Sequence, residues 1–361
     1  MERALQRLSN LPKISIIIVN LNGKKWLEIC LPSIFRSKYP KDKMEIILVD
    51  NGSIDNSVEY FLQQVRKYGL SHIVIRNKHN MGWSPANNQG AKVASGDFLI
   101  FLSNDIELEP NALREIVNTF LKHKDIGVIQ FNSLSMWDKK TTDSAMNFLD
   151  IYGFAYGYVP QDKLYTVTFA EGMAFAIRKD IFFQVGMFDD YYFMEYDDMD
   201  LSLRVWLTGY KVVFHPRAIV YHARGGTVGR DYFTKKLNNI KNYTRNHIVT
   251  LLKIWPWKML VYVLPMVIII QLIKTLVISF IFKKSQLSKA VILGLFEAIR
   301  DSYKIIKYKR KKVQEIKIIS DNDFKQIFHP FKPALQYIFL KKQHAGRRFY
   351  INARPPYKLP S

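Results

Sequence analysis

The sequence predicts an α/β fold with a mainly parallel central sheet, followed by a helical region at the C-terminal end. Two observations carry this prediction. Four short apolar runs rich in β-branched residues alternate with amphipathic segments over residues 14–105, which is typical of parallel strands covered by helices on both faces. The most apolar segment, residues 259–282, precedes a strongly basic tail. The chain of 361 residues is long enough for two ordinary domains or for one domain with an appended region.

The four predicted strands are separated by three predicted helices. The strands are residues 14–21, 45–50, 72–77 and 97–105. The helices, with apolar side chains at three-to-four spacing, are residues 24–37, 57–69 and 84–95. Polar clusters follow three of the strands, at Asn20–Asn22, Asp50–Ser53 and Ser103–Asp105. Ligands of parallel sheets bind at the C-terminal ends of strands, so these clusters indicate a binding edge.

The composition limits the class of protein. Hydrophobic residues make up 48% of the chain, which excludes a disordered or fibrous protein. The net charge of +22 suggests a polyanionic partner such as nucleic acid, an anionic membrane surface or a phosphorylated substrate. A single cysteine, Cys30, permits no intramolecular disulfide and no cysteine metal site, so we expect a reducing, cytoplasmic setting. The first 13 residues contain no apolar run of the length that a secretory signal needs.

The apolar run at residues 259–282 could cross a bilayer, because a helix of that length would measure about 36 Å. Pro265, Gln271 and Lys274 interrupt it, and lysines flank both of its ends, so the positive-inside rule gives no orientation. Basic flanks suit a hairpin or an in-plane helix, and a buried core helix is the alternative. The basic cluster Lys307–Lys312 fits an anionic leaflet. We therefore expect a folded domain over residues 1–250, on the cytoplasmic side, and a membrane-associated region over residues 251–361.

Two carboxylates end apolar strands at the predicted binding edge. Asp50 could accept hydrogen bonds from a uracil or thymine edge or from a ribose, or it could cap the turn that follows. Asp105 could hold a hard divalent cation that bridges phosphates, or it could serve only in a turn. The glycine-rich fingerprints of dinucleotide-binding and P-loop proteins are absent, which removes the main support for those two classes.

Four motifs occur in one order along the chain: VNLNG at 19–23, VDNGSIDNS at 49–57, the segment 77–108 and the segment 171–204. Together they resemble the GT-A-fold glycosyltransferases of family 2, especially the rhamnosyltransferase-like members, and the resemblance covers residues 13–225. It implies a GT-A nucleotide-binding fold. It also implies an inverting transfer of a sugar from a nucleotide-sugar donor to a hydroxyl of a growing glycan or lipid-linked acceptor in cell-surface polysaccharide or glycoconjugate synthesis, assisted by Mg²⁺ or Mn²⁺.

The resemblance also implies roles for individual residues. Nucleotide-sugar contacts fall to Asn20, Asp50, Asn80, Gly82, Asn87, Ser103 and Asn104, with Trp83 in place of a more usual Phe. Ser103 replaces the first Asp of the DxD motif, so the metal would be held by Asp105, with His222 matching a histidine ligand of some relatives. Gly172 and Met173 would line the acceptor side.

The acidic segment EYDDMDLSLR holds the candidates for acid-base chemistry. An inverting transfer needs a carboxylate that takes the proton of the acceptor hydroxyl. In a helix that begins here, Asp197 and Asp200 share a face while Asp198 points elsewhere. The resemblance selects Asp198 as the base, with Asp197 as the alternative and Asp200 as an anchor of the helix N-terminus. Arg204 either pairs with the acidic cluster or approaches the diphosphate.

Three other classes of protein remain as alternatives. A sugar nucleotidyltransferase would be expected to carry a glycine-rich activating loop where this chain has LNGKK. A nucleic-acid-binding protein would use the charge of +22, yet the basic tail contains no recognisable nucleic-acid motif and adjoins an apolar run that favours membrane, so no nucleic-acid partner is expected. A catalytically inactive, membrane-bound partner of another transferase is suggested only by Ser103.

Overall fold

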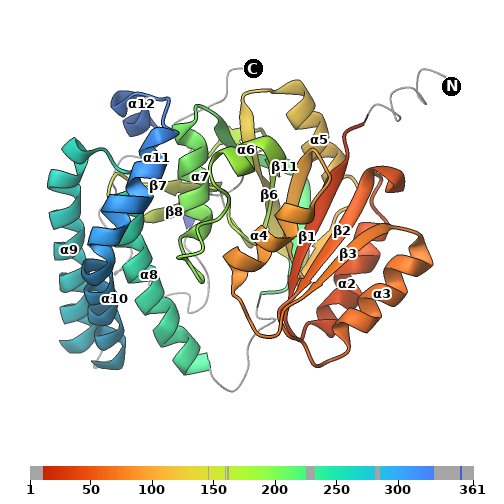
Figure 1. Ribbon diagram of the computed structural model, residues 1–361, viewed down its shortest axis with the longest axis horizontal. Coiled ribbons are helices and arrows are strands. Elements are labelled where there is room, and N and C mark those ends of the chain that lie inside the picture. Colours follow the sequence, from red (N-terminus) through yellow and green to blue (C-terminus); the bar gives the residue numbers. More distant parts are fainter. Residues whose placement is uncertain are drawn as a thin grey trace.

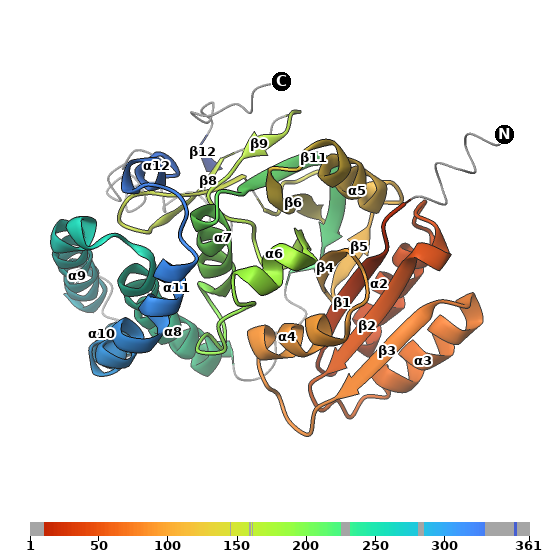
Figure 2. The same ribbon diagram turned by 45° about the horizontal axis from the view of Figure 1, so that its top comes forward.

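The computed structural model describes residues 11–144, 146–158, 160, 162–224, 232–280, 285–328 and 350–351. Strands and covering helices of the N-terminal part form one end of the molecule, and a layer of C-terminal helices forms the other (Figure 1). Figure 2 shows the same arrangement from a second side, with helix α7 (Asp197–Leu207) between the two ends.

The first half of the main sheet is parallel, as predicted. Its strand order is β3-β2-β1-β4. The strands are β1 (Ile14–Asn20), β2 (Met44–Asp50), β3 (Ser71–Arg76) and β4 (Phe98–Ser103). The connecting helices are α2 (Lys24–Phe35), α3 (Ser57–Tyr68) and α4 (Trp83–Val93), with a short 3₁₀ turn η1 (Lys41–Lys43) before β2. Each of these predicted strands and helices therefore exists, with ends that differ from the prediction by at most two residues.

The second half of the sheet is mixed, so the prediction of a mainly parallel sheet is wrong beyond β4. Strand β10 (Ala174–Arg178) runs antiparallel to β4 and to β6 (Ile126–Ser135), while β11 (Lys211–His222) runs parallel to β6. The short strands β5 (Ile106–Leu108) and β9 (Tyr165–Thr166) pair antiparallel with β11. Parallel neighbours require a crossover connection, usually one helix. Between β4 and β10 lie several elements instead, which leaves the direction of β10 free.

Those intervening elements include helix α5 (Ala112–Lys122) and two of the three strands of a small second sheet. The second sheet consists of β7 (Met146–Leu149), β8 (Ala155–Tyr158) and β12 (Tyr350–Ile351), in the order β12-β8-β7. Helix α6 (Lys179–Gln184) follows β10, and α7 follows α6.

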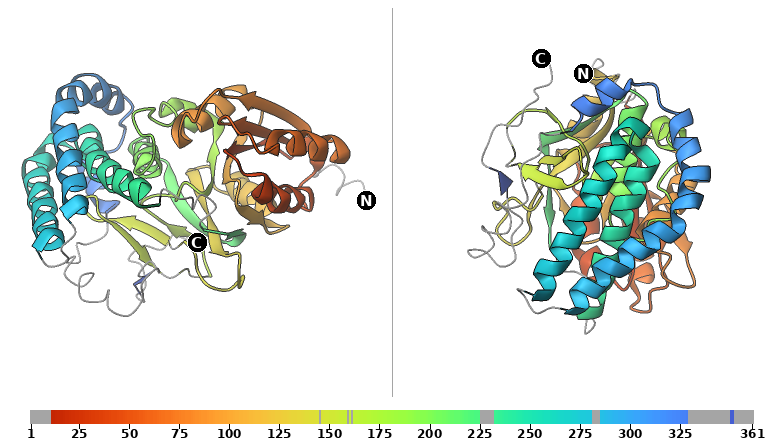
Figure 3. Two further views of the ribbon diagram at one scale, coloured as in Figure 1. Left: turned by 90° about the horizontal axis from the view of Figure 1, so that it is seen from below. Right: turned by 90° about the vertical axis from the view of Figure 1, so that its left-hand side faces the viewer.

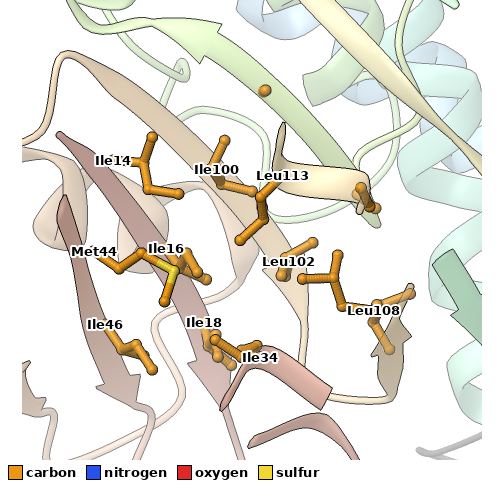
Figure 4. Close-up of a cluster of buried hydrophobic side chains, with 14 of the residues drawn as sticks. Ile14, Ile16, Ile18, Ile34, Met44, Ile46, Ile100, Leu102, Leu108 and Leu113 are labelled. Atoms are coloured by element: carbon orange, nitrogen blue, oxygen red, sulfur yellow. The ribbon is translucent and has the colours of Figure 1, made fainter. Parts of the chain in front are cut away.

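Both faces of the main sheet are covered, as the apolar strands require. Ile16 and Ile18 of β1 contribute to one buried cluster beneath α2, α3 and α5 (Figure 4). Ile17, which points to the opposite face, belongs to a second cluster with residues of α4, α6 and α7. The consecutive burial of these side chains explains why the strands are continuous apolar runs rather than alternating ones. Cys30 lies in the first cluster as a buried free thiol.

The C-terminal helices pack against α7 around a third buried cluster that contains Trp255 and Phe324. They are α8 (Tyr232–Ile254), α9 (Trp257–Phe280), α10 (Ser285–Lys304), the π-helical turn η2 (Ile305–Arg310), α11 (Lys311–Glu315) and α12 (Asp321–Gln326). Helix α8 runs through position 250, and the predicted division there stays a prediction. Residues 281–282 of the predicted apolar run and most of the tail after 328 lie outside the described residues.

Candidate active site

A cavity of about 650 Å³ lies beside the ends of β4 and β11. Its lining includes six residues that the sequence singled out: Ser103, Gly172, Met173, Asp197, Asp198 and His222. Trp83, Glu171 and Tyr243 line it as well. The fold thus brings together residues from six separate parts of the chain around one space large enough for a small organic ligand.

A network of polar side chains lies at the edge where β1, β2 and β4 end. The Asn20 amide donates to Asp50 Oδ1 over 2.9 Å and to the Ser57 hydroxyl over 2.8 Å. Asn20 Oδ1 accepts a hydrogen bond of 2.9 Å from the Asn104 amide. The Ser53 amide donates to Asp50 Oδ2 over 2.9 Å, so the turn-capping interpretation of Asp50 holds in this structure. These bonds fix the orientation of Asp50 before any ligand is bound.

A second polar group lies in the loop that leads into α4. Asn80 Oδ1 accepts hydrogen bonds from the Gly82 amide at 2.9 Å and from the Asn51 side chain at 3.1 Å. Gly82 has φ +89°, and a Cβ there would lie 2.7 Å from the ring of Phe193. Only glycine therefore fits this position. Asn87 is fully buried; its amide donates to the Trp83 carbonyl over 3.0 Å, while its Oδ1 has no hydrogen-bond partner.

Asp105 and His222 form a pair at the same edge. His222 Nε2 lies 3.4 Å from Asp105 Oδ2, and His222 Nδ1 lies 2.9 Å from Asp143 Oδ2. Arg224 also bonds Asp143. Burial alone would lower the pKa of His222, but the hydrogen bonds and charges of Asp105 and Asp143 raise it to about 9.

The contact between His222 and Asp143 is one that histidine ligands of metal ions commonly make. A carboxylate that holds one ring nitrogen of a histidine, leaving the other nitrogen for a metal, is a recurrent arrangement at metal centres, and Asp143 occupies that position here. Across the residues that the structure describes, no three His, Cys, Asp or Glu side chains are grouped to hold a metal. Asp105 and His222 could thus supply two ligands, with phosphate oxygens of a substrate as others.

Asp197 and Asp198 lie at the start of α7, as the sequence predicted. Asp197 accepts a 2.9 Å hydrogen bond from the Ser84 hydroxyl, and Asp198 Oδ2 accepts one of 2.9 Å from the Gly172 amide. Burial raises the pKa of both carboxyls, and the neighbouring charge of Asp197 raises the pKa of Asp198 further. A carboxyl with a raised pKa beside a cavity is suited to take up a proton near neutral pH.

The backbone before α7 is strained but firmly held. Glu195 and Tyr196 have φ of 71° and 69°, a left-handed conformation that is costly for residues other than glycine. The fully buried Asn246 of α8 donates to the carbonyls of Met194 and Glu195 over 2.9 and 2.7 Å. Helix α8 thereby fixes the segment that delivers both acids to the cavity.

The structure assigns Asp200 and Arg204 to a buried network rather than to the cavity. Arg204 donates to Asp200 Oδ2 through Nε at 2.9 Å and Nη2 at 2.7 Å. Lys253 of α8 lies 2.6 Å from Asp200 Oδ1. Arg204 is buried and also donates to the carbonyls of Val185 and Met187, so of its two predicted roles it has the one of pairing with the acidic cluster.

Asp200→Ala is expected to lower the free energy of unfolding by about 3–5 kcal/mol, because it leaves the buried charge of Arg204 without its partner. This exceeds the effect of about 1 kcal/mol that a helix-anchor role would give. Chemical denaturation of the variant against the unchanged chain measures the difference. A matched control is Asp323→Ala, which removes an exposed carboxylate in the capping box of α12 and should cost only about 1 kcal/mol.

Sequence reasoning did not assign three residues that shape the site. Asp143 holds His222, Glu171 lines the cavity and receives a hydrogen bond from Ser144, and Asn246 holds the segment before α7. Glu171 is the first residue of the segment 171–204, one of the four motifs, so its position could have marked it as a site residue. Asp143 and Asn246 stand outside all four motifs, and nothing in their local pattern marks them.

Comparison with known proteins supports the family resemblance. Residues 15–186 match the family described as Glycosyl transferase family 2. The probable glycosyltransferase YdaM of Bacillus subtilis is 27% identical over 221 residues, which cover 60% of this chain and 52% of YdaM. Polypeptide N-acetylgalactosaminyltransferase 3 of Taeniopygia guttata is 29% identical, covering 61% of this chain and 39% of that protein. This chain thus spans about half the length of YdaM, and less of the second relative.

Solved structures show the same fold. The S. aureus TarS fragment 1–349 in complex with UDP-GlcNAc has a TM-score of 0.55 at 13% identity, covering 88% of this chain and 93% of that one. GalNAc-T7 with UDP, GalNAc and Mn²⁺ also has a TM-score of 0.55, at 20% identity, covering 68% of this chain and 51% of that one. These likenesses establish a GT-A-like α/β fold. The match to glycosyltransferase family 2 covers residues 15–186, so it is this part of the chain that is similar to that family.

Proposed function

We propose that this protein is an inverting glycosyltransferase that moves a sugar from a nucleotide-sugar donor to a hydroxyl of a glycan or lipid-linked acceptor. The observation that supports it most is the lining of a single cavity. Asp198, with its raised pKa, lines the same cavity as Ser103 and His222, next to the edge that holds Asn20 and Asp50. A candidate base and a candidate donor site therefore adjoin, as direct transfer requires.

The residues suggest a division of labour. Asp50, already held by Asn20 and Ser53, would accept hydrogen bonds from the base or ribose of the donor. Asp198 would take the proton of the acceptor hydroxyl as the new bond to the anomeric carbon forms and the bond to the diphosphate breaks, with inversion. The Gly172 amide, which donates to Asp198, keeps this carboxylate oriented. Asp105 and His222 would hold a divalent cation, Mg²⁺ or Mn²⁺, which offsets negative charge on the diphosphate.

The donor and the acceptor belong to this proposal as well. Structural neighbours include complexes with UDP-GlcNAc and with GDP-mannose, so both UDP and GDP sugars should be tried. The resemblance to rhamnosyltransferase-like members adds a nucleotide-activated rhamnose as a third candidate donor. A role in cell-surface polysaccharide synthesis, on the cytoplasmic side of a membrane, completes the proposal.

A screen of nucleotide sugars tests this function. Purified full-length protein is incubated with Mn²⁺ and each donor, and release of the nucleoside diphosphate is followed. We expect slow hydrolysis of one donor, and a rate lower by roughly 10²- to 10⁴-fold with Asp198→Asn. Tight donor binding without any turnover would indicate instead a catalytically inactive partner of another transferase. Release of diphosphate from a nucleoside triphosphate and a sugar phosphate would indicate a sugar nucleotidyltransferase.

The pH dependence of turnover should reflect the raised pKa of Asp198. Its carboxyl must be ionised to accept a proton, so turnover should fall as pH drops through the raised pKa, well above the ordinary value of 3.8. The measurement is kcat against pH for hydrolysis or transfer. The residual rate of Asp198→Asn should lack this acid limb. A wild-type rate that stays flat down to pH near 4 would contradict a base in this environment.

A further inference from the structure

Helix α9 buries polar side chains and exposes apolar ones, which is unusual for a helix in contact with water. Its polar side chains Gln271 and Thr275 are buried, and the ammonium of Lys274 lies 4.4 Å from the ring centre of Phe154. Apart from Lys258 near its start, its outward side chains are mainly apolar; those that are 42–77% exposed include Val261, Met266, Ile269, Ile273, Leu276 and Phe280. A surface helix in water shows the reverse order, with the apolar stripe facing inward. The outer side of α9 is therefore built for an apolar environment.

Helix α10 extends the same apolar surface. Ile292, Phe296, Ile299 and Tyr303 are 52–67% exposed along it. The two helices are neighbours at the end of the molecule away from the parallel strands, as Figure 3 (right) shows face on. The Ser279 hydroxyl donates to the Ser288 hydroxyl between them over 2.9 Å. The exposed apolar residues thus gather on one face of two adjoining helices instead of lying singly, which marks an interaction surface.

The inner side of α9 is tied to the rest of the protein. Met259, Val263 and Val267 are buried in the cluster shared with α7 and α8. Gln271 hydrogen-bonds His247 of α8 over 3.4 Å. Helix α9 is long and apolar enough to cross a membrane, yet 28% of its most apolar window is buried inside the protein. Crossing a bilayer would expose these inner groups to lipid and break the contacts with α8, whereas lying flat preserves them.

Charge identifies the kind of apolar environment. Residues 257–315 contain twelve Lys and Arg against three Asp and Glu. Two of those acids are already paired: Glu297 bonds Lys241 and Arg245, and Asp301 bonds Arg300. The exposed lysines of these elements, Lys258, Lys289, Lys304, Lys307, Lys311 and Lys312, carry the uncompensated charge. Apolar side chains beside lysines match a leaflet with anionic headgroups, because the apolar side chains insert among the lipids while the lysines are attracted to the headgroups.

We propose that α9 and α10 form a docking surface for an anionic membrane, on which α9 lies in the plane of the leaflet without crossing it. Docking would bring the cavity close to a lipid-linked acceptor, and this part of the proposal rests on the proposed function. The docking itself depends on the two helices alone.

Vesicle binding by the full chain tests the docking surface. Vesicles of phosphatidylcholine, with or without phosphatidylglycerol, are floated with wild type, Ile273→Glu, Phe296→Glu and the matched control Val93→Glu, which changes an exposed apolar side chain of α4. We expect wild type and the control to bind vesicles with phosphatidylglycerol, more weakly in high salt. Each docking variant should bind at least about tenfold less, since a charge replaces an inserted apolar side chain.

Three outcomes would overturn the proposal. The docking variants could bind vesicles as wild type does. Wild type could fail to bind vesicles and instead form an oligomer that Ile273→Glu dissociates. That result would show that the surface is an interface between copies of the chain. The third outcome concerns the variants Lys258→Cys and Lys289→Cys, bound to vesicles and treated with a membrane-impermeant maleimide. If only one of the two cysteines were labelled until detergent was added, α9 would cross the bilayer. The native Cys30 is buried and adds little background.

Donor hydrolysis without vesicles separates this proposal from the proposed function. The docking variants should hydrolyse the donor at the wild-type rate, because no residue of the cavity is changed. If wild type hydrolyses no donor while vesicle binding follows the expected order, the enzymatic proposal fails and the docking surface stands.

Discussion

Asp198→Asn is expected to lower transfer by roughly 10²- to 10⁴-fold while donor binding persists. The substitution keeps the size of the side chain and its acceptance of the Gly172 amide, but removes the group that takes the proton. Turnover with a saturating donor, together with nucleotide binding by calorimetry, measures the two effects separately. A loss of donor binding equal to the loss of turnover would show that Asp198 holds the substrate and is not the base.

Asp197→Asn is the matched control for this experiment. Its carboxylate is more deeply buried and bonded to the Ser84 hydroxyl, so its main effect on Asp198 is through charge. We expect a smaller loss of turnover than for Asp198→Asn. If Asp197→Asn abolished transfer while Asp198→Asn stayed near wild type, the base would move by one residue. If both variants stayed active, the base would lie elsewhere in the cavity.

Asp197→Asn and Asp198→Asn should lower turnover but raise the stability of the folded protein. A carboxyl whose pKa is raised on folding binds its proton more tightly in the folded state, so its contribution to stability is lost as pH rises through the raised pKa. At neutral pH the charged carboxylates therefore cost stability. Neutral asparagine at either position should raise the melting temperature, the trade-off expected where a site is built for function.

The parallel half of the fold could be predicted because its information is local. Each strand of the set β1, β2 and β4 is a mainly apolar run closed by a polar turn, and one α-helix lies between successive strands from β1 to β4. The direction of β10 could not be predicted, since the run AFAI looks the same in either orientation and no single helix joins it to β4.

The site likewise contains residues that could be predicted from local sequence and residues that could not. Asn20, Asp50 and Asp105 could be found because each lies at the C-terminal end of a predicted strand, and parallel strands bring these ends to one edge. Asp143 meets His222 from 79 positions away, and Asn246 meets Met194 from 52 positions away. Such contacts depend on how separate elements pack. For α9, composition showed an apolar helix, but only packing shows that Gln271 and Thr275 face inward.

Asp105→Ala is expected to lower transfer by several orders of magnitude and to leave the fold intact, because the carboxylate would hold the cation that offsets charge on the leaving diphosphate. Asp105 is nearly buried beside His222, and no other described carboxylate lies as close to that imidazole except Asp143, which holds its other nitrogen. Chelation of wild type should abolish transfer, and Mn²⁺ or Mg²⁺ should restore it.

A matched control for Asp105→Ala is Glu107→Gln, two positions along the chain, where the carboxylate pairs with Arg36 and Lys139. This variant should keep its metal-dependent activity. Binding can be read without turnover, because the electron paramagnetic resonance signal of free Mn²⁺ should diminish on adding wild type with UDP and persist with Asp105→Ala. Full wild-type activity in excess chelator would remove the metal from the mechanism. Equal Mn²⁺ binding by both proteins would instead place the cation away from Asp105, and His222 paired with Asp143 would then be a structural ion pair.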